Sequence, residues 1–112
     1  MKIAIPVSAG RLCPHFGHCE QFALIEIDQT TGQPHEPTYL TPPPHEPGVL
    51  PRWLHEQGAD VIIAGGMGQR AQQLFASHGI QVVVGADSRT PVELVTAFCN
   101  GALTPGQNPC DH

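Results

Sequence analysis

Residues 60–84 carry the pattern that most restricts what this chain can fold into. A continuous apolar run at 60–64 (DVIIA) is followed by a glycine-rich segment at 65–68 (GGMG), and then by a helical pattern that ends at Gly79. A second apolar run follows at 80–84 (IQVVV). Short apolar runs of this kind are typical of buried strands. The connection is long enough for a right-handed crossover, so the sequence predicts two parallel strands joined by a helix, in an α/β fold.

The remaining elements are predicted from shorter patterns. Residues 2–7 read as a buried strand, with Pro6 expected at its end or beside an unpaired edge. Residues 21–28 form a second strand, and residues 38–40 return as an antiparallel edge strand. Residues 50–57 read as a helix in which Trp53 packs into the core.

The last helix is predicted from a capping box. Thr90 stands at the cap, Pro91 is first in the helix and Glu93 occupies the third position. Asn100-Gly101 ends the helix. Three residues on it are expected to face the core, and Cys99 is expected to be a small buried hydrophobe. The three are Val92, Val95 and Phe98.

Length and charge limit the domain count and the partners. A chain of 112 residues is long enough for one domain, which we place at 1–101, followed by a flexible Pro/Gly tail at 102–112. The net charge is −5, and the five Lys and Arg residues are scattered, so neither nucleic acid nor a membrane surface is an expected partner. The apolar start of the chain lacks the pattern of a signal segment, and a cytoplasmic location with reduced thiols is the expectation.

One loop concentrates side chains that bind metals. Four potential ligands fall within seven consecutive residues: Cys13, His15, His18 and Cys19. Thiolates and imidazoles suit zinc, copper(I) and iron–sulfur centres. Pro14 and Gly17 interrupt regular structure, and we see no packing need for the thiols. The loop therefore predicts a metal or metal-cluster site, to which His45, Cys110 and His112 are candidate additions.

The glycine-rich loop is a candidate for the anionic side of such a site. Glycines allow close approach of a ligand, and a helix start offers unpaired N–H groups with a positive dipole end. The candidate residues are Gly65, Gly66, Met67, Gly68 and Gln69. A tight turn that needs small residues for packing explains the glycines equally well. If the strands ending near Val7 and Ala64 are parallel neighbours, both loops leave from one edge of the sheet, where ligands of open α/β sheets bind.

Taken in order, several motifs resemble those of the dinitrogenase iron–molybdenum cofactor family, which includes the NifX and NafY proteins, the C-terminal part of NifB and the small orange protein. These motifs are residues 1–7, the His15-Phe16-Gly17 element, the strand around Phe22, and residues 58–62, 65–68 and 79–82. The resemblance implies a ribonuclease-H-like three-layer α/β fold, with a mixed, roughly five-stranded sheet flanked by helices and without nuclease activity. It also implies binding or carrying of a metal–sulfur cluster or its precursor. His15 matches the family element, whereas Cys13, His18 and Cys19 are additions in this chain.

The expected function is therefore that of a small non-catalytic protein that binds or carries a metal or a metal–sulfur cluster similar to an iron–molybdenum cofactor precursor. The metal can be Fe, Mo, Cu or Zn. A cluster donor or acceptor protein is a further candidate partner. Two alternatives stay open: a small thiol or redox enzyme that uses Cys13 or Cys19, and a regulatory interaction module without metal.

Overall fold

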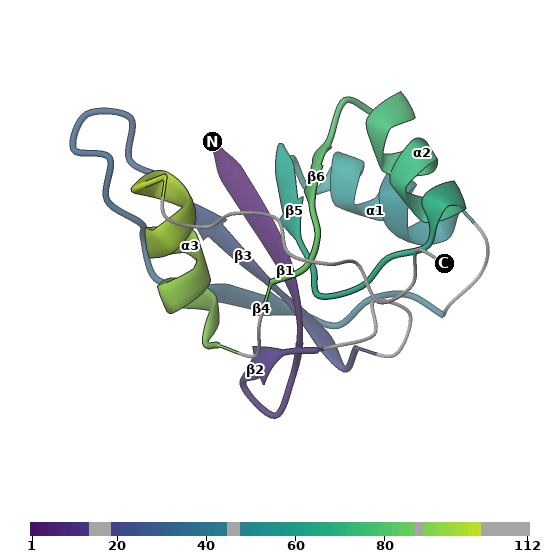
Figure 1. Cartoon of the computed structure of the whole chain (residues 1–112), viewed down its shortest axis with the longest axis horizontal. Helices are drawn as coiled ribbons and strands as arrows, with labels where there is room; N and C mark the ends of the chain where they lie inside the picture. Colours follow the sequence, from purple (N-terminus) through teal and green to yellow (C-terminus); the bar gives the residue numbers. More distant parts are fainter. Residues whose placement is uncertain (14–18, 45–47, 87–88, 102–112) are drawn as a thin grey trace.

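A computed structural model of the chain describes residues 1–13, 19–44, 48–86 and 89–101. These residues form six strands and three helices, and the predicted α/β class is confirmed (Figure 1). In chain order the elements are β1 (Lys2–Ser8), β2 (Arg11–Leu12), β3 (Gln21–Glu26), β4 (Thr38–Leu40), α1 (Val49–Glu56), β5 (Val61–Ile63), α2 (Gln69–Ser77), β6 (Gln81–Val83) and α3 (Pro91–Cys99).

Strand β1 is the centre of a mixed sheet with the order β4-β3-β1-β5-β6. It is antiparallel to β3 and parallel to β5, and β5 is in turn parallel to β6. The five strands on this path match the expected sheet, with β4 at an edge as predicted. The predicted strand–helix–strand unit is β5-α2-β6. The two-residue strand β2 was not predicted, and it pairs with the end of β1.

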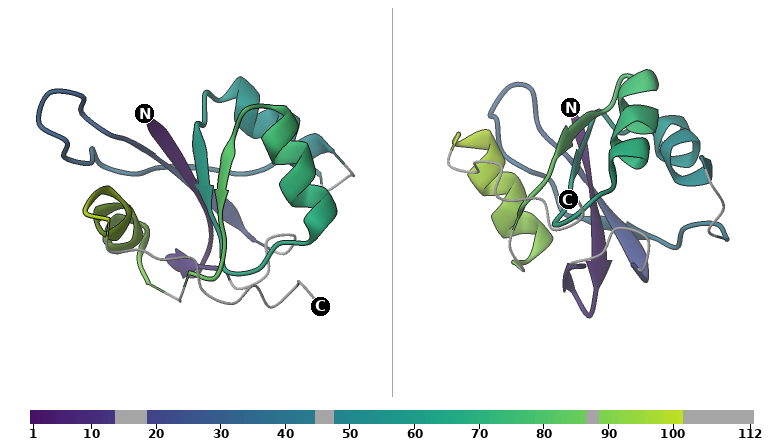
Figure 2. Two further views of the ribbon diagram at one scale, coloured as in Figure 1. Left: turned by 45° about the horizontal axis from the view of Figure 1, so that its top comes forward. Right: turned by 45° about the vertical axis from the view of Figure 1, so that its right-hand side comes forward.

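Helices cover both faces of the sheet, so that the apolar strands are buried on each side (Figure 2). The face covered by α1 and α2 contains Phe22, Leu54 and Phe75, which are fully buried. The face covered by α3 contains Leu94 and Val95. Trp53 packs against the first of these clusters, with its ring centroid 5.7 Å from that of Phe22 in an edge-to-face contact. Its predicted role in packing is confirmed.

Helix α3 begins with the predicted capping box, but its buried face differs from the prediction. The Thr90 hydroxyl accepts from the Glu93 N–H, and the Glu93 carboxylate accepts from the Thr90 N–H. Val95 is buried and Phe98 packs against the α3-side cluster, as expected. Val92, however, is 42% exposed and Cys99 is also exposed, so both predictions were wrong. The helix is only nine residues long and contacts the sheet on one side, so only a narrow stripe of its side chains is buried.

Pro6 lies inside the central strand, so the prediction that it stands at the strand's end was wrong. It is opposite Phe22 of β3. Its carbonyl oxygen accepts from the Cys13 N–H, which follows β2, so the Pro6 nitrogen also faces away from β3. The missing donor therefore removes no hydrogen bond from the β1–β3 ladder.

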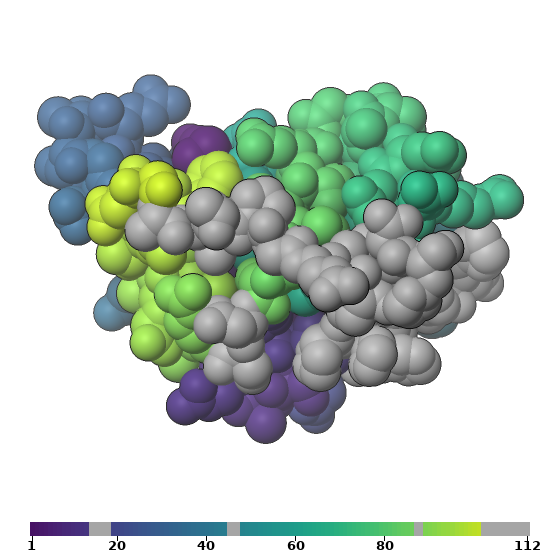
Figure 3. Space-filling model, in the orientation of Figure 1, coloured from purple at the N-terminus to yellow at the C-terminus, as the bar shows by residue number. Residues whose placement is uncertain are grey.

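A tight turn joins β1 to β2 and projects from the surface (Figure 3). Ser8 pairs with Arg11, which leaves Ala9 and Gly10 as the two central residues. Both have positive φ, of 54° and 79°. Positive φ at both positions of a two-residue hairpin loop is the signature of a type I′ turn.

Candidate functional site

The two loops singled out in the sequence leave from the same edge of the sheet. Strands β1 and β5 are parallel neighbours, with Ile3 opposite Val61 and Ala4 opposite Ile62. The two strands are therefore parallel neighbours, which is the arrangement that brings both loops to one edge of the sheet. The Cys/His loop follows the carboxyl end of β1 through β2, and the glycine-rich loop follows the carboxyl end of β5 (Figure 1).

Cys13 is held in place by the end of β1. Its N–H donates to the Pro6 carbonyl oxygen at 2.9 Å, and the residue is only 5% exposed. The preceding residue, Leu12, is buried in the α3-side cluster, and its N–H donates to the Arg89 carbonyl oxygen at 3.0 Å. One flank of the loop is therefore attached to the sheet through backbone hydrogen bonds.

Cys19 is held on the other side of β1. The N–H of the next residue, Glu20, donates to the Val7 carbonyl oxygen at 3.0 Å, immediately before β3 begins. Cys19 is half-buried and packs against the cluster under α1 and α2, which also contains Ala64 and Met67 from the glycine-rich loop and its approach. The statement that the thiols serve no packing need was wrong, because both cysteines lose solvent contact on folding.

The environment of Cys19 keeps its sulfur protonated at neutral pH. Burial, followed by the electrostatic interaction with Cys13, raises the pKa of Cys19 to about 11. A metal cation bound at this sulfur would compensate the cost of its ionisation, because the thiolate is the form that binds metal.

Part of the predicted ligand set lies outside the described residues. These ligands are His15, His18, His45, Cys110 and His112. The predicted tail at 102–112 lies outside them too. Among residues 1–13, 19–44, 48–86 and 89–101, no three His, Cys, Asp or Glu side chains are grouped in a way that could hold a metal ion. The structure thus places two of the four loop ligands, Cys13 and Cys19, on either side of β1.

The glycine-rich loop is fastened on its β6 side. The Gly65 carbonyl oxygen accepts from the Gly85 N–H at 2.8 Å, and Gly65, Gly66 and Met67 are buried. The Gln72 side-chain amide donates to the Met67 carbonyl oxygen at 2.9 Å. The loop is therefore a compact turn in which Gly65, Gly66 and Met67 are buried and Gly68 is exposed.

Gly68 forms the start of α2. It has extended backbone angles (φ −65°, ψ 156°), and as a glycine it supplies no side-chain cap to the helix. A Cβ atom at this position would meet no atom within 4 Å. Neither strain nor crowding among the described residues thus demands glycine at 68, and the exposed start of the helix can be approached by an anion.

Glu20 is a residue of this edge that sequence reasoning missed. Its carboxylate accepts from the Ser8 hydroxyl at 2.7 Å and from the Ala9 N–H at 3.1 Å. These two hydrogen bonds lower the pKa of Glu20, the serine hydroxyl having the larger effect. The contacts join the β1–β2 turn to the residue beside Cys19. No spacing in the sequence indicated them, because the partners are brought together only by the pairing of β1 with β3.

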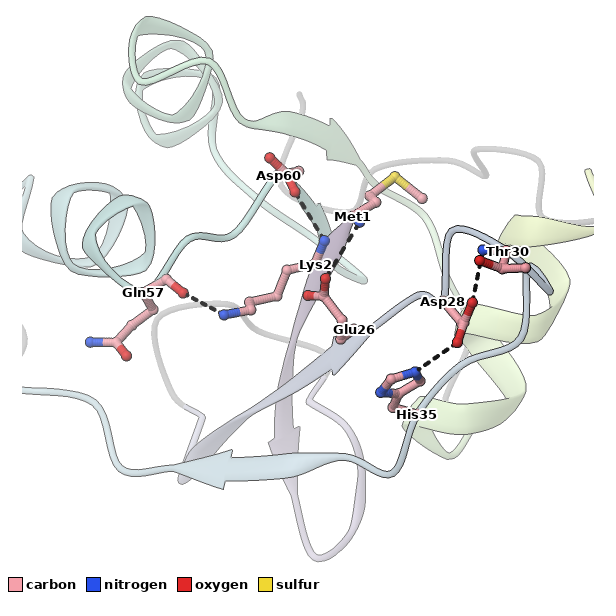
Figure 4. Close-up of polar contacts among 8 residues, drawn as sticks. All are labelled: Met1, Lys2, Glu26, Asp28, Thr30, His35, Gln57 and Asp60. Atoms are coloured by element: carbon pink, nitrogen blue, oxygen red, sulfur yellow. Dashed lines mark hydrogen bonds and ion pairs between the residues drawn. The ribbon is translucent and has the colours of Figure 1, made fainter.

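A surface hollow of about 460 Å³ lies beside this turn, lined in part by Val7, Gly10 and Glu20. A second hollow, of about 590 Å³, lies near the opposite edge of the sheet and is lined in part by Lys2, Glu26 and Gln57 (Figure 4). No helix within the described residues is long and apolar enough to cross a membrane.

Comparisons with known proteins agree with this architecture. The chain is 32% identical over 106 residues to the protein MJ0580 of Methanocaldococcus jannaschii, covering 92% of this chain and 89% of that protein. The crystal structure of PH0822 is similar with a TM-score of 0.82 and 29% identity, over 94% of each chain. The apo form of the orange protein from Desulfovibrio gigas has a similar fold, with a TM-score of 0.75 and 24% identity over 96% of this chain and 94% of that one. Residues 1–101 match the family described as dinitrogenase iron-molybdenum cofactor, and this chain therefore belongs to that family.

Proposed function

We propose that this protein binds or carries an anionic metal–sulfur cluster, or a precursor of one, at the carboxyl edge of β1 and β5. The observation that carries the proposal is the shared position of the two loops: Cys19 packs against the same cluster as Ala64 and Met67. Membership of the cofactor family supports a role connected with clusters. We also propose that the fold is ribonuclease-H-like and that the protein is located in the cytoplasm.

The two sides of this edge would supply different chemistry. Cys13 and Cys19 would hold metal through sulfur, and His15 and His18, which lie between them in the sequence, would complete the ligand set. The start of α2 at Gly68 would face the negative charge of the cluster with the positive end of its helix dipole. This combination fits an anionic metal–sulfur species better than a bare cation, because a cation gains nothing from a helix N-terminus.

We further propose that the protein is not an enzyme. A nucleophilic cysteine needs a lowered pKa, whereas the pKa of Cys19 is raised to about 11. A raised thiol pKa is compatible with a ligand that becomes deprotonated only when metal arrives.

The metal side is tested with a double variant, Cys13→Ala with Cys19→Ala. We expect tetrathiomolybdate binding to be lost and Zn²⁺ binding to fall by one ion per chain, while the circular dichroism spectrum stays native. The matched control is Cys99→Ala, which removes an exposed thiol of α3 and should bind both as the parent does. Full occupancy in the folded double variant would refute the ligand assignment.

The anion side is tested with Gly68→Val. A Cβ at this position meets no atom within 4 Å and the φ is negative, so the variant should fold. We expect tetrathiomolybdate to bind much more weakly, because the branched side chain covers the start of α2. Zn²⁺ should bind the Cys/His loop unchanged, since it uses side chains alone. If both species bind equally well to parent and variant, the glycine-rich loop has no role in anion binding and is only a turn. The protein would then be a cation-binding protein and not a cluster carrier.

A further inference from the structure

Two histidines meet where helices α1 and α2 end. His55 lies in the last turn of α1, and His78 is the C-cap residue of α2. Their ring centroids are 5.3 Å apart, with an angle of 38° between the ring planes. His55 is exposed and His78 is half-buried, so the pair is open to solvent on one side.

Hydrogen bonds hold both helix ends at the amino edge of the sheet. The Lys2 ammonium donates to the carbonyl oxygen of Gln57, the C-cap residue of α1, at 3.0 Å (Figure 4). Ile80, just before β6, donates its N–H to the Phe75 carbonyl oxygen at 3.0 Å. The two imidazoles are thus presented by helices whose ends are tied to β1 and β6.

We propose that His55 and His78 form a binding site for a divalent transition-metal ion that prefers nitrogen ligands, such as Ni²⁺, Cu²⁺ or Zn²⁺. The site joins the end of α1 to the end of α2. It is separate from the cluster site of the preceding section and does not depend on it.

The ring separation matches the geometry of two imidazoles on one ion. A metal–nitrogen bond of about 2.0–2.1 Å places the ring centroid about 3.2 Å from the metal. With a tetrahedral angle at the metal, two such rings have centroids about 5 Å apart. The observed 5.3 Å therefore matches the spacing expected for two imidazoles on one ion.

The local charge also favours a cation. Both histidines stand at helix C-termini, where the unpaired carbonyl groups carry partial negative charge. The chain has a net charge of −5. The described part of the chain supplies no third His, Cys, Asp or Glu ligand here, so water fills the remaining positions. Imidazole with water is a ligand set that suits late first-row divalent ions.

One ion cannot serve both sites. Helix α2 begins at the carboxyl edge beside the glycine-rich loop and ends at His78, nine helical residues later. At 1.5 Å per residue this is about 13 Å, several times a metal–ligand bond. Figure 1 shows α1 and α2 side by side on one face of the sheet, in agreement with the contact between His55 and His78.

The test follows the ring protons of all seven histidines by NMR while Ni²⁺ is added to the full chain. Bound Ni²⁺ broadens nearby protons, so we expect the His55 and His78 signals to broaden together. In His55→Ala, broadening of His78 should require on the order of a hundredfold more Ni²⁺, because the second ligand no longer raises the effective concentration. Reading His78 directly separates this site from any Ni²⁺ held by the Cys/His loop.

The matched control is His35→Ala, which removes an exposed histidine that lies 3.6 Å from the Asp28 carboxylate in the segment between β3 and β4 (Figure 4). It should leave the response of His55 and His78 unchanged. As a second readout, Ni²⁺ should raise the unfolding midpoint of His35→Ala more than that of His55→Ala, since an ion bound only by the folded state stabilises it. An unchanged His78 response in His55→Ala, or equal effects of the two variants, would overturn the proposal.

Discussion

Replacing Ala9 with glycine should stabilise this protein, against the usual direction of an alanine-to-glycine change. Ala9 has φ 54°, in the left-handed region that disfavours a side chain with a Cβ. A non-glycine residue there costs about 1–2 kcal/mol. Glycine removes that strain. It also gives the unfolded chain more conformational freedom, which lowers the free energy of unfolding by about 0.5–1 kcal/mol. The net expectation is about 0.5 kcal/mol in favour of Ala9→Gly.

The contacts of the turn should survive the change. Ala9 uses only its backbone N–H, which donates to the Glu20 carboxylate at 3.1 Å. Ala9→Asn should stabilise by about the same amount or more, because asparagine tolerates the left-handed region without the full freedom of glycine. For a domain of this size, about 0.5 kcal/mol corresponds to a rise of about 2 °C in Tm.

The assay is thermal and urea unfolding followed by circular dichroism. The matched control is Ala76→Gly, the same chemical change at an exposed position of α2, where it should destabilise by about 0.5–1 kcal/mol. Opposite signs for the two variants are the expected result. A fall in stability for Ala9→Gly equal to that of Ala76→Gly would refute the assignment of strain to the turn.

Three further predictions concern α3 and the thiols. Thr90→Ala should lower the free energy of unfolding by about 1 kcal/mol in urea titrations, because it removes the helix cap. Hydrogen bonds from the Thr90 hydroxyl and N–H lower the pKa of the Glu93 carboxyl in the folded protein. The stabilisation from these bonds is therefore fully present above the pKa that Glu93 has in the unfolded chain, and it is lost as the pH falls through the pKa that Glu93 has in the folded protein. The effect of Thr90→Ala should therefore shrink in acid, and a constant difference from neutral to acid pH would contradict the linkage. Val95→Ala should lower the free energy of unfolding by about 1–3 kcal/mol, because Val95 is buried. Val92→Ala should change it by no more than about 0.5 kcal/mol, because Val92 is exposed. Equal losses of stability in urea unfolding would contradict the observed buried face of α3. In metal-free protein at neutral pH, iodoacetamide should label Cys19 more slowly than the exposed Cys99. The labelling rate of Cys19 should rise with pH until about pH 11. A Cys19 rate that levels off near neutral pH would instead indicate a nucleophilic cysteine.

Tertiary contacts decided the features that sequence reasoning missed at the site. The strand β2 has only two residues, too few for a periodic pattern, and it exists because the turn at Ala9 and Gly10 folds it back onto β1. The partners of Glu20 lie eleven and twelve residues away, so no local rule predicts them. The burial of Cys13 and Cys19 likewise depends on where the loop is attached to β1.

Local physics explains what the sequence determined by itself. The strand–helix–strand unit follows from two apolar runs separated by glycines and a helical pattern, and the α3 cap follows from Thr90, Pro91 and Glu93 alone, since a capping box is closed within one turn. The placement of both candidate loops at one edge also followed from chain order, once β1 and β5 were parallel neighbours. That adjacency, the choice of Val95 over Val92 for the core, and the meeting of His55 with His78 were decided only by tertiary structure. Each depends on how whole elements pack against one another, and the free energy of that packing is spread over residues distant in the chain.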